Sequence, residues 1–191
     1  MISIVSGLPR SGTSLMMQML AAGGMPIMSD EIRAPDTHNP RGYLEDRRVK
    51  SLESDNTWLA EAEGHALKVI SLLLYELPTD LQYRVVFMRR DLDEVLRSQH
   101  RMLAADSNAH AAPEIRTHFE RHLVSLSAWF PRQSHLELLE IDYCRVVREP
   151  ETAAASVAGF LKQELDLAAM ASVVDPSLYR NRNSSSEDVS T

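Results

Sequence analysis

The sequence has little of what stabilises a small secreted scaffold or attaches a chain to a membrane. Among 191 residues there is one cysteine, Cys144, so no internal disulfide can form. No run of about 18 apolar residues occurs, and we therefore expect no membrane-spanning helix. The first residues form an apolar segment with no preceding basic region, so we expect no secretory signal and a cytoplasmic location.

The sequence also lacks an excess of positive charge. Lysine and arginine number 20 against 27 acidic residues, which gives a net charge of −7. This balance argues against nucleic acid or an anionic membrane as the main partner. The 44% hydrophobic and 25% charged content is ordinary for a globular protein. We expect one domain over residues 1–180 and a mobile, polar, serine-rich tail over 181–191.

The segment over residues 2–20 has the pattern of a strand, a glycine turn and a helix. Residues 2–5 are apolar and mostly β-branched, as in a buried parallel strand. Residues 7–14 contain two glycines, one proline and three hydroxyl side chains, and residues 15–20 are apolar and helix-forming. Such a connection places backbone N–H groups and the start of a helix around a phosphate.

The glycine turn differs from a nucleotide-triphosphate loop at one position. The spacing from Gly7 to Gly12 and Ser14 fits that loop, but Thr13 stands where a lysine would contact the β- and γ-phosphates. The cation inside the turn is Arg10 instead. The simpler alternative is a tight turn that binds nothing. The combination of hydroxyls, glycines and an arginine favours a phosphate group other than a triphosphate.

A second anion-binding pattern follows the apolar strand predicted over residues 83–88. Arg90 comes at the end of that strand, and Asp91 with Glu94 has the spacing of a capping box for the next helix. Ser98 lies eight residues after Arg90. An arginine at a strand end can bind a phosphate through two parallel N–H donors, and a serine on the following helix can contact the same phosphate. The alternative is an exposed arginine and an unrelated helix serine.

These motifs resemble those of the sulfotransferases that use 3′-phosphoadenosine 5′-phosphosulfate (PAPS). The run Leu-Pro-Arg-Ser-Gly-Thr-Ser over residues 8–14 is most similar to the 5′-phosphosulfate loop of tyrosylprotein sulfotransferases and their bacterial relatives. Arg90 with Ser98 resembles the family's 3′-phosphate motif. The run Asn-Pro-Arg-Gly-Tyr-Leu-Glu over residues 39–45 resembles an acceptor-facing segment of the bacterial proteins.

The resemblance implies a fold and a set of donor-binding residues. The fold is an α/β three-layer sandwich like that of P-loop NTPases, with a mainly parallel sheet of about four strands in the order 2-3-1-4. A C-terminal segment closes over the nucleotide in related enzymes, but the basic segment typical of cytosolic members is absent here. The residues implied in PAPS binding are Pro9, Arg10, Ser11, Gly12, Thr13, Ser14, Arg90, Ser98, Tyr179 and Arg180.

Two further residues are candidates for catalysis alongside Arg10. Glu45, predicted to begin a helix that reaches about residue 59, would act as the general base, with Asp46 as the substitute. Its alternative role is to stabilise the helix start. Lys68 lies in a strand predicted over residues 66–70 and would contact the sulfuryl group, as a lysine does in many sulfotransferases. Its alternative is an outward lysine on an edge strand.

The remaining elements complete an alternating α/β pattern. We predict a fourth strand over residues 136–143, and helices over 92–103, 114–130, 151–161 and 166–173. His118 and His122 have a spacing that can bind a metal, but no third ligand accompanies them, and a packing role is favoured.

The function predicted from these patterns is sulfuryl transfer from PAPS to a hydroxyl or amine of a small molecule or peptide, without a metal, leaving adenosine 3′,5′-bisphosphate. A small-molecule kinase with an altered loop and a non-catalytic nucleotide-binding homologue are the alternatives. The chain is short for the family, and a homodimer would complete an acceptor pocket.

Overall fold

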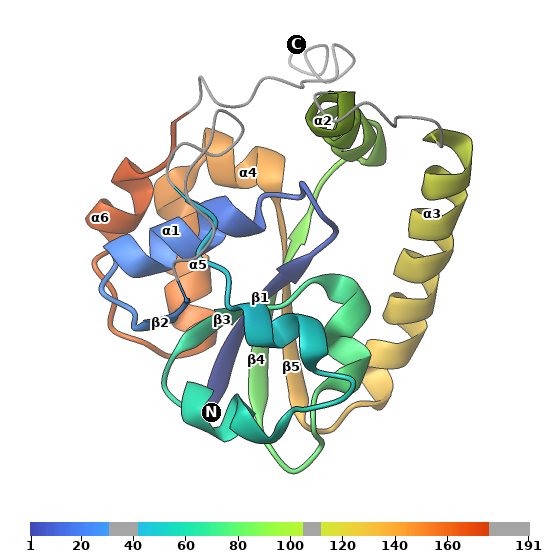
Figure 1. The fold of residues 1–191 in the computed structure, drawn as a ribbon. Coiled ribbons are helices and arrows are strands. Elements are labelled where there is room, and N and C mark those ends of the chain that lie inside the picture. The colour runs from blue at the N-terminus through green and yellow to red at the C-terminus, as the bar shows by residue number, and fades with distance from the viewer. Residues whose placement is uncertain (31–41, 105–111, 176–191) are drawn as a thin grey trace.

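A five-stranded parallel sheet forms the centre of the protein (Figure 1). The structure, a computed structural model, describes residues 1–30, 42–104 and 112–175. The strands are β1 (Ile2–Gly7), β2 (Ile27–Met28), β3 (Ala66–Lys68), β4 (Tyr83–Arg89) and β5 (Leu136–Asp142), in the spatial order β2-β3-β1-β4-β5. Every adjacent pair is parallel. All six residues of β1 are buried, as its apolar sequence predicts.

Helices cover both faces of this sheet. The α-helices are α1 (Thr13–Ala22), α2 (Leu92–Ala104), α3 (Ala112–Trp129), α4 (Tyr143–Arg148), α5 (Pro150–Leu161) and α6 (Leu167–Ser172). The 3₁₀ helices are η1 (Arg47–Ser51), η2 (Thr57–Ala62), η3 (Ser71–Glu76) and η4 (Phe130–Arg132). In Figure 1, α1, α4, α5 and α6 lie on one side of the sheet and α3 on the other. Among the described residues, no helix is long and apolar enough to cross a membrane.

The alternation of side chains along the strands divides the core into two apolar clusters. Val5, Val86 and Met88 pack against α1, α4, α5 and α6. Ile4 and Val85, one position away, pack instead against the 3₁₀ helices and α3. Successive residues of a strand point to opposite faces, so each strand contributes to both clusters. The architecture is therefore the three-layer α/β sandwich that the sequence predicts.

The predicted strand order needs one correction. Read over all five strands, the order begins 2-3-1-4, as predicted, and ends with β5. The prediction did not include β2, which has two residues, so the segments that it numbered second, third and fourth are β3, β4 and β5. The segment predicted as the second strand is β3, and it pairs with β1. A two-residue strand has no periodicity by which the sequence could reveal it.

The helix predicted from Glu45 to about residue 59 is wrong. Glu45 precedes η1, and Asp46 is the capping residue, since its side chain accepts a hydrogen bond from the Arg48 backbone N–H at 2.9 Å. Two 3₁₀ helices, η1 and η2, replace the single α-helix. The helices predicted in the second half of the chain are present with ends shifted by about one or two residues.

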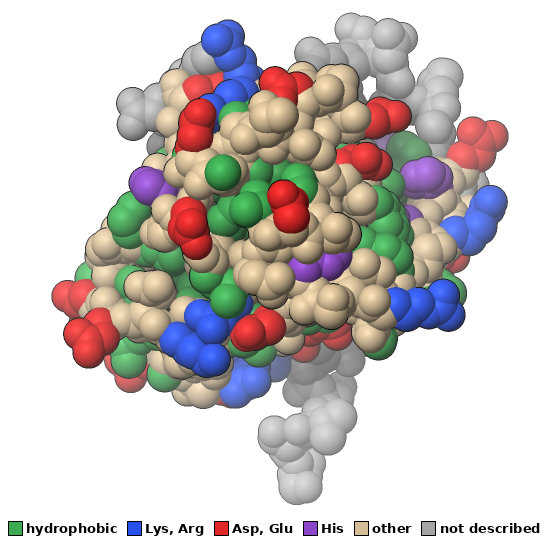
Figure 2. Space-filling model, turned by 90° about the horizontal axis from the view of Figure 1, so that it is seen from below, with side chains coloured by type: hydrophobic (Ala, Val, Ile, Leu, Met, Phe, Trp, Pro, Cys, Tyr) green, Lys and Arg blue, Asp and Glu red, His purple; other side chains and the backbone are tan. Residues whose placement is uncertain are grey.

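The two ends of the sheet differ in what surrounds them. The carboxyl ends of β1 and β4 lead into the connections toward α1 and α2, near the top of Figure 1. Figure 2 shows the opposite end, where acidic and basic side chains are interspersed with apolar ones. In open parallel sheets, ligands bind outside the carboxyl ends of the strands. That end of the sheet is therefore where a functional site is expected.

Candidate functional site at the carboxyl ends of the strands

The connection from β1 to α1 has a backbone that requires glycine at both ends. Gly7 has φ +151° and Gly12 has φ +104°. A Cβ on Gly12 would lie 2.4 Å from Cδ2 of Tyr143, and one on Gly7 would lie 2.7 Å from the Met88 carbonyl oxygen. The turn is therefore pressed against the ends of β4 and β5, where only glycine fits.

The same turn presents the amino end of α1 without a cap. Gly12 supplies no side-chain hydrogen bond, and no acidic residue occupies the first turn of α1. The backbone N–H groups and the positive end of the helix dipole therefore suit an anion. Within the described residues, the hydroxyls of Ser6 and Ser11 are buried and have no hydrogen-bond partner. Buried hydroxyls normally have hydrogen-bond partners, so two buried hydroxyls without one also fit a loop that holds a polar ligand.

Arg10 and Arg90 meet at the middle of this turn. Arg10 has φ +69°, a left-handed conformation that costs an L-residue about 1–3 kcal/mol unless its surroundings hold it. Nη1 of Arg90 donates to the Arg10 carbonyl oxygen at 3.1 Å, which fixes that conformation. Nε of Arg10 donates to Oγ of Ser98, on α2, at 3.0 Å. The three residues predicted to bind the two ends of a nucleotide thus lie in direct contact.

Arg90 is also part of a buried ion pair. Its Nε donates to Oε2 of Glu94 at 3.0 Å, and the two side chains are only 9% and 4% exposed. Its guanidinium lies 4.3 Å from the ring centre of Tyr143. Burial raises the pKa of the Tyr143 hydroxyl, and the charges of Arg90 and Arg10 oppose this only in part. Tyr143 is therefore a neutral ring on which the guanidinium stacks.

Lys68 is the centre of a second group, on the other flank of α1. Its Nζ lies 3.0 Å from Oγ of Ser14, in the first turn of α1, and 2.8 Å from Oε1 of Glu45. It also donates to the Tyr43 carbonyl oxygen at 3.4 Å. The Lys68 side chain is 7% exposed, which excludes the role of an outward lysine on an edge strand. An ammonium buried to this degree needs anionic or carbonyl partners, and here it has both.

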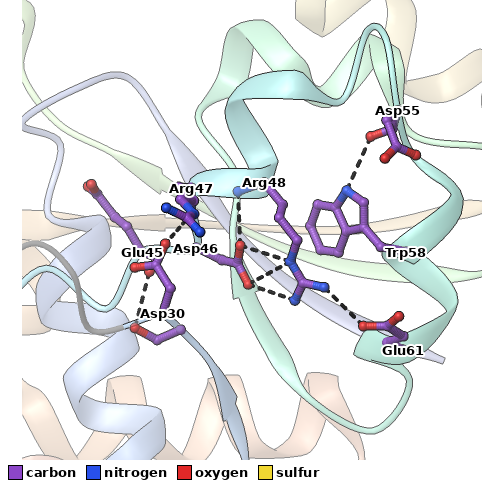
Figure 3. A network of polar contacts seen from close by, with 9 residues as sticks. Asp30, Glu45, Asp46, Arg47, Arg48, Asp55, Trp58 and Glu61 are labelled. Carbon is purple, nitrogen blue, oxygen red and sulfur yellow. Dashed lines mark hydrogen bonds and ion pairs between the residues drawn. The ribbon is translucent and has the colours of Figure 1, made fainter.

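The two adjacent carboxylates, Glu45 and Asp46, have different surroundings. Figure 3 shows their side chains on opposite sides of the chain. Glu45 contacts Lys68, whereas Asp46 contacts the guanidinium of Arg48. Burial would raise the pKa of Asp46, but hydrogen bonds and charge from Arg48 outweigh it and lower that pKa. A carboxylate saturated with donors is a poor base, so Asp46 does not fit the substitute role predicted for it.

A cavity of about 370 Å³ adjoins Arg90 at the ends of β4 and β5. Its lining residues are Arg89, Arg90, Asp91, Glu94, Asp142, Tyr143, Cys144, Arg145, Arg148 and Glu149. Arginines supply four of these positions, carboxylates supply another four, and Tyr143 supplies an aromatic ring. The cavity is large enough for part of a small ligand, and its walls combine both signs of charge with one aromatic ring.

The structure brings most of the predicted site residues to one end of the sheet. Arg10, Arg90 and Ser98 form one group, and Ser14, Lys68 and Glu45 form the other, with the α1 amino end between them. Tyr179 and Arg180 lie outside the described residues, as do the first three residues of the run at 39–45. Whether the grouped residues bind a nucleotide stays a prediction.

Sequence reasoning missed the partners of these residues. Glu94 was interpreted as a capping-box residue, and its pairing with Arg90 was not foreseen, although the i, i+4 spacing was a signal. Asp91 does cap α2, accepting from the Glu94 backbone N–H at 3.1 Å. Tyr143 gave no comparable signal, since its ring comes from a segment more than fifty residues away.

The two histidines with metal-binding spacing, His118 and His122, both lie on α3. Nε2 of His122 lies 3.0 Å from Oγ of Ser71, and both side chains are buried, so His122 has the packing role that the sequence favoured. Over the described part of the chain, no group of three or more His, Cys, Asp or Glu residues is arranged to hold a metal ion.

Comparison with known proteins gives the fold. No family model matches the sequence, and no curated protein does. The structure is similar to the sulfotransferase domain of the olefin synthase from Synechococcus PCC 7002, with TM-score 0.59 and 15% identity over 95% of this chain and 88% of that one. It is also similar to the sulfotransferase domain from the curacin biosynthetic pathway, with TM-score 0.55 and 13% identity over 96% and 92% of the two chains. The protein therefore has a sulfotransferase-like fold.

Proposed function

We propose that the protein transfers a sulfuryl group from PAPS to a hydroxyl or amine acceptor. The observation that carries the proposal is the contact of Lys68 with both Ser14 and Glu45. It brings together a cation, the amino end of α1 and a carboxylate, which would stabilise developing negative charge, hold the donor's phosphate and take the acceptor's proton. The sulfotransferase-like fold supports the proposal.

The residues present fit a bisphosphate donor. PAPS supplies an activated sulfuryl group on its 5′-phosphate. The turn over residues 9–14 would hold that phosphate with backbone N–H groups and the hydroxyls of Thr13 and Ser14. Arg90 and Ser98 would hold the 3′-phosphate, with Arg10 close to both ends. These two groups of side chains contain three cations, Arg10, Lys68 and Arg90, of which Lys68 is paired with Glu45 and Arg90 with Glu94.

The proposed reaction is a single in-line displacement. The acceptor oxygen or nitrogen forms a bond to sulfur as the bond between sulfur and the bridging phosphate oxygen breaks, and adenosine 3′,5′-bisphosphate leaves. Glu45 takes the proton that the acceptor loses. The ammonium of Lys68 then donates its hydrogen bonds to the sulfuryl oxygens in place of Glu45, because negative charge accumulates on these oxygens in the transition state. A Walker lysine and a metal between phosphates have no role in this scheme, which agrees with Thr13 in the loop.

Two measurements on the full chain test the proposal. Adenosine 3′,5′-bisphosphate should raise the melting temperature, and Mg-ATP should not. With ³⁵S-labelled PAPS, label should pass to a member of a pool of simple phenols, alcohols and amines. A shift with Mg-ATP alone would favour the kinase alternative. A shift with the bisphosphate but no label in any acceptor or in released sulfate would favour a non-catalytic binder.

A further inference from the structure

The carboxylate of Asp46 is buried and held from two directions by one residue. Its Oδ1 accepts from the backbone N–H of Arg48 at 2.9 Å and from Nε of Arg48 at 3.1 Å. Its Oδ2 accepts from Nη2 at 2.8 Å. The Asp46 side chain is 4% exposed. Two-point binding by a planar guanidinium fixes the orientation of the carboxylate as well as its position, which a lysine could not do.

Arg48 is itself held on its remaining sides (Figure 3). Its guanidinium carbon lies 4.4 Å from the ring centre of Trp58, and Nη1 donates to Oε2 of Glu61 at 2.9 Å. The Trp58 indole N–H donates to the Asp55 carbonyl oxygen at 3.1 Å. Asp46 is thereby linked through Arg48 to η2, an element that packs in the apolar core.

The backbone that carries Glu45 is constrained on both sides. Leu44 has φ +49°, which a bulky side chain adopts only when its surroundings hold it there. The Glu45 carbonyl oxygen accepts from Oγ of Ser29 and from the backbone N–H of Asp30, each at 3.1 Å. Oδ2 of Asp30 accepts from the backbone N–H of Arg47 at 2.8 Å. The direction of the Glu45 side chain is therefore set by the chain between Leu44 and Arg47.

We infer that Arg48 is a positioning residue for Glu45: by locking Asp46, it holds the backbone so that the Glu45 carboxylate meets Lys68. The inference rests on the proposed function, in which Glu45 is the base. Glu45 and Asp46 are adjacent and point to opposite sides, so a rotation of the backbone that carries both would move the Glu45 carboxylate relative to Lys68. Arg48→Ala would leave the buried Asp46 carboxylate with the backbone N–H of residue 48 but without the guanidinium charge, which favours a turn of the chain that brings the carboxylate to water.

A double-mutant cycle with Arg48→Ala and Glu45→Gln tests the inference. In the wild-type background, Arg48→Ala should lower the rate of ³⁵S transfer, or of sulfate release to water, by about 10²-fold, because small misplacements of reacting groups have effects of that size. Binding of adenosine 3′,5′-bisphosphate should stay unchanged. In the Glu45→Gln background the same substitution should change the rate by no more than about twofold, since groups that act as a unit are not additive.

Matched variants separate positioning from general stability. Arg48→Lys keeps the positive charge but loses the two-point binding of the Asp46 carboxylate. Its transfer rate should lie between those of the wild type and Arg48→Ala. Lys50→Ala removes an exposed cation from the same 3₁₀ helix and should leave the rate at the wild-type level. Equal losses from Arg48→Ala in both backgrounds would show a structural role and overturn the inference. So would a wild-type rate in Arg48→Ala.

A readout that does not use activity keeps the two proposals apart. The Glu45 carboxyl can be followed by ¹³C NMR through a pH titration in the wild type, Lys68→Met and Arg48→Ala. If Arg48 positions Glu45 against Lys68, the Arg48→Ala titration should match that of Lys68→Met. A titration that matches the wild type would overturn the inference. An inactive wild type with the expected titrations would overturn the proposed function and leave the positioning role supported.

Discussion

Replacing Lys68 with methionine removes the ammonium group that contacts both Ser14, at the start of α1, and Glu45. The methionine chain fills the space of the aliphatic stem, so no cavity forms, and the change is the loss of the ammonium. Breaking a fully buried pair costs about 3–5 kcal/mol, because the remaining charge is left without a partner. Glu45 is 29% exposed and water reaches it, so we discount this to about 1–3 kcal/mol of unfolding free energy.

The stability of Lys68→Met can be measured by urea denaturation. With a slope of about 2 kcal/mol per molar urea, the midpoint should fall by about 0.5–1.5 M. Sulfuryl transfer should fall by about 10²–10³-fold, the usual effect of removing one preorganised charge from developing negative charge. The double variant Lys68→Met with Glu45→Gln should regain stability, because no unpaired charge remains. A midpoint and a rate equal to those of the wild type would refute the reasoning, as would additive losses in the double variant.

Two further changes test other parts of the structure. Gly12→Ala should cost about 2–4 kcal/mol and abolish the thermal shift with adenosine 3′,5′-bisphosphate, because its Cβ would lie 2.4 Å from the Tyr143 ring at φ +104°. Gly24→Ala is the matched control, with φ +91° but no atom within 4 Å of its Cβ, and should cost only about 1–2 kcal/mol and keep the shift. Burial and the charge of His118 lower the pKa of His122, so the unfolded chain binds its proton more readily, and stability should fall as pH drops below about 6.5. His122→Gln should reduce that fall in urea midpoints measured between pH 7.5 and 5.5, and an unchanged fall would contradict the burial argument.

Local pattern was sufficient to predict the elements that surround the phosphate loop. An apolar β-branched strand, a turn with two glycines and an apolar helix appear where the sequence places them, as do β4, α2 and the cap at Asp91. These features depend on neighbours in the chain. The region from Glu45 to Ala62 was predicted wrongly as one α-helix, because its two 3₁₀ helices are too short for a periodic apolar pattern and are held by tertiary contacts.

Contacts between distant segments could be anticipated only in part. Glu45 and Lys68 were each selected by residue type and place, but their ion pair spans 23 residues and no local rule specifies it. The stacking of Arg90 on Tyr143 depends on the pairing of β4 with β5, which the predicted strand order did not contain. The network of Asp46, Arg48 and Trp58 depends on the turn at Leu44, whose positive φ the sequence does not reveal.

The central claim is that the β1–α1 turn and the Arg10–Arg90–Ser98 group bind one bisphosphate nucleotide. A crystal structure of the protein with adenosine 3′,5′-bisphosphate tests this directly. The account predicts the 5′-phosphate on the backbone N–H groups at the start of α1 and the 3′-phosphate within hydrogen-bond distance of Ser98 and Arg90. A nucleotide bound elsewhere, or one whose 3′-phosphate contacts neither residue, would contradict it.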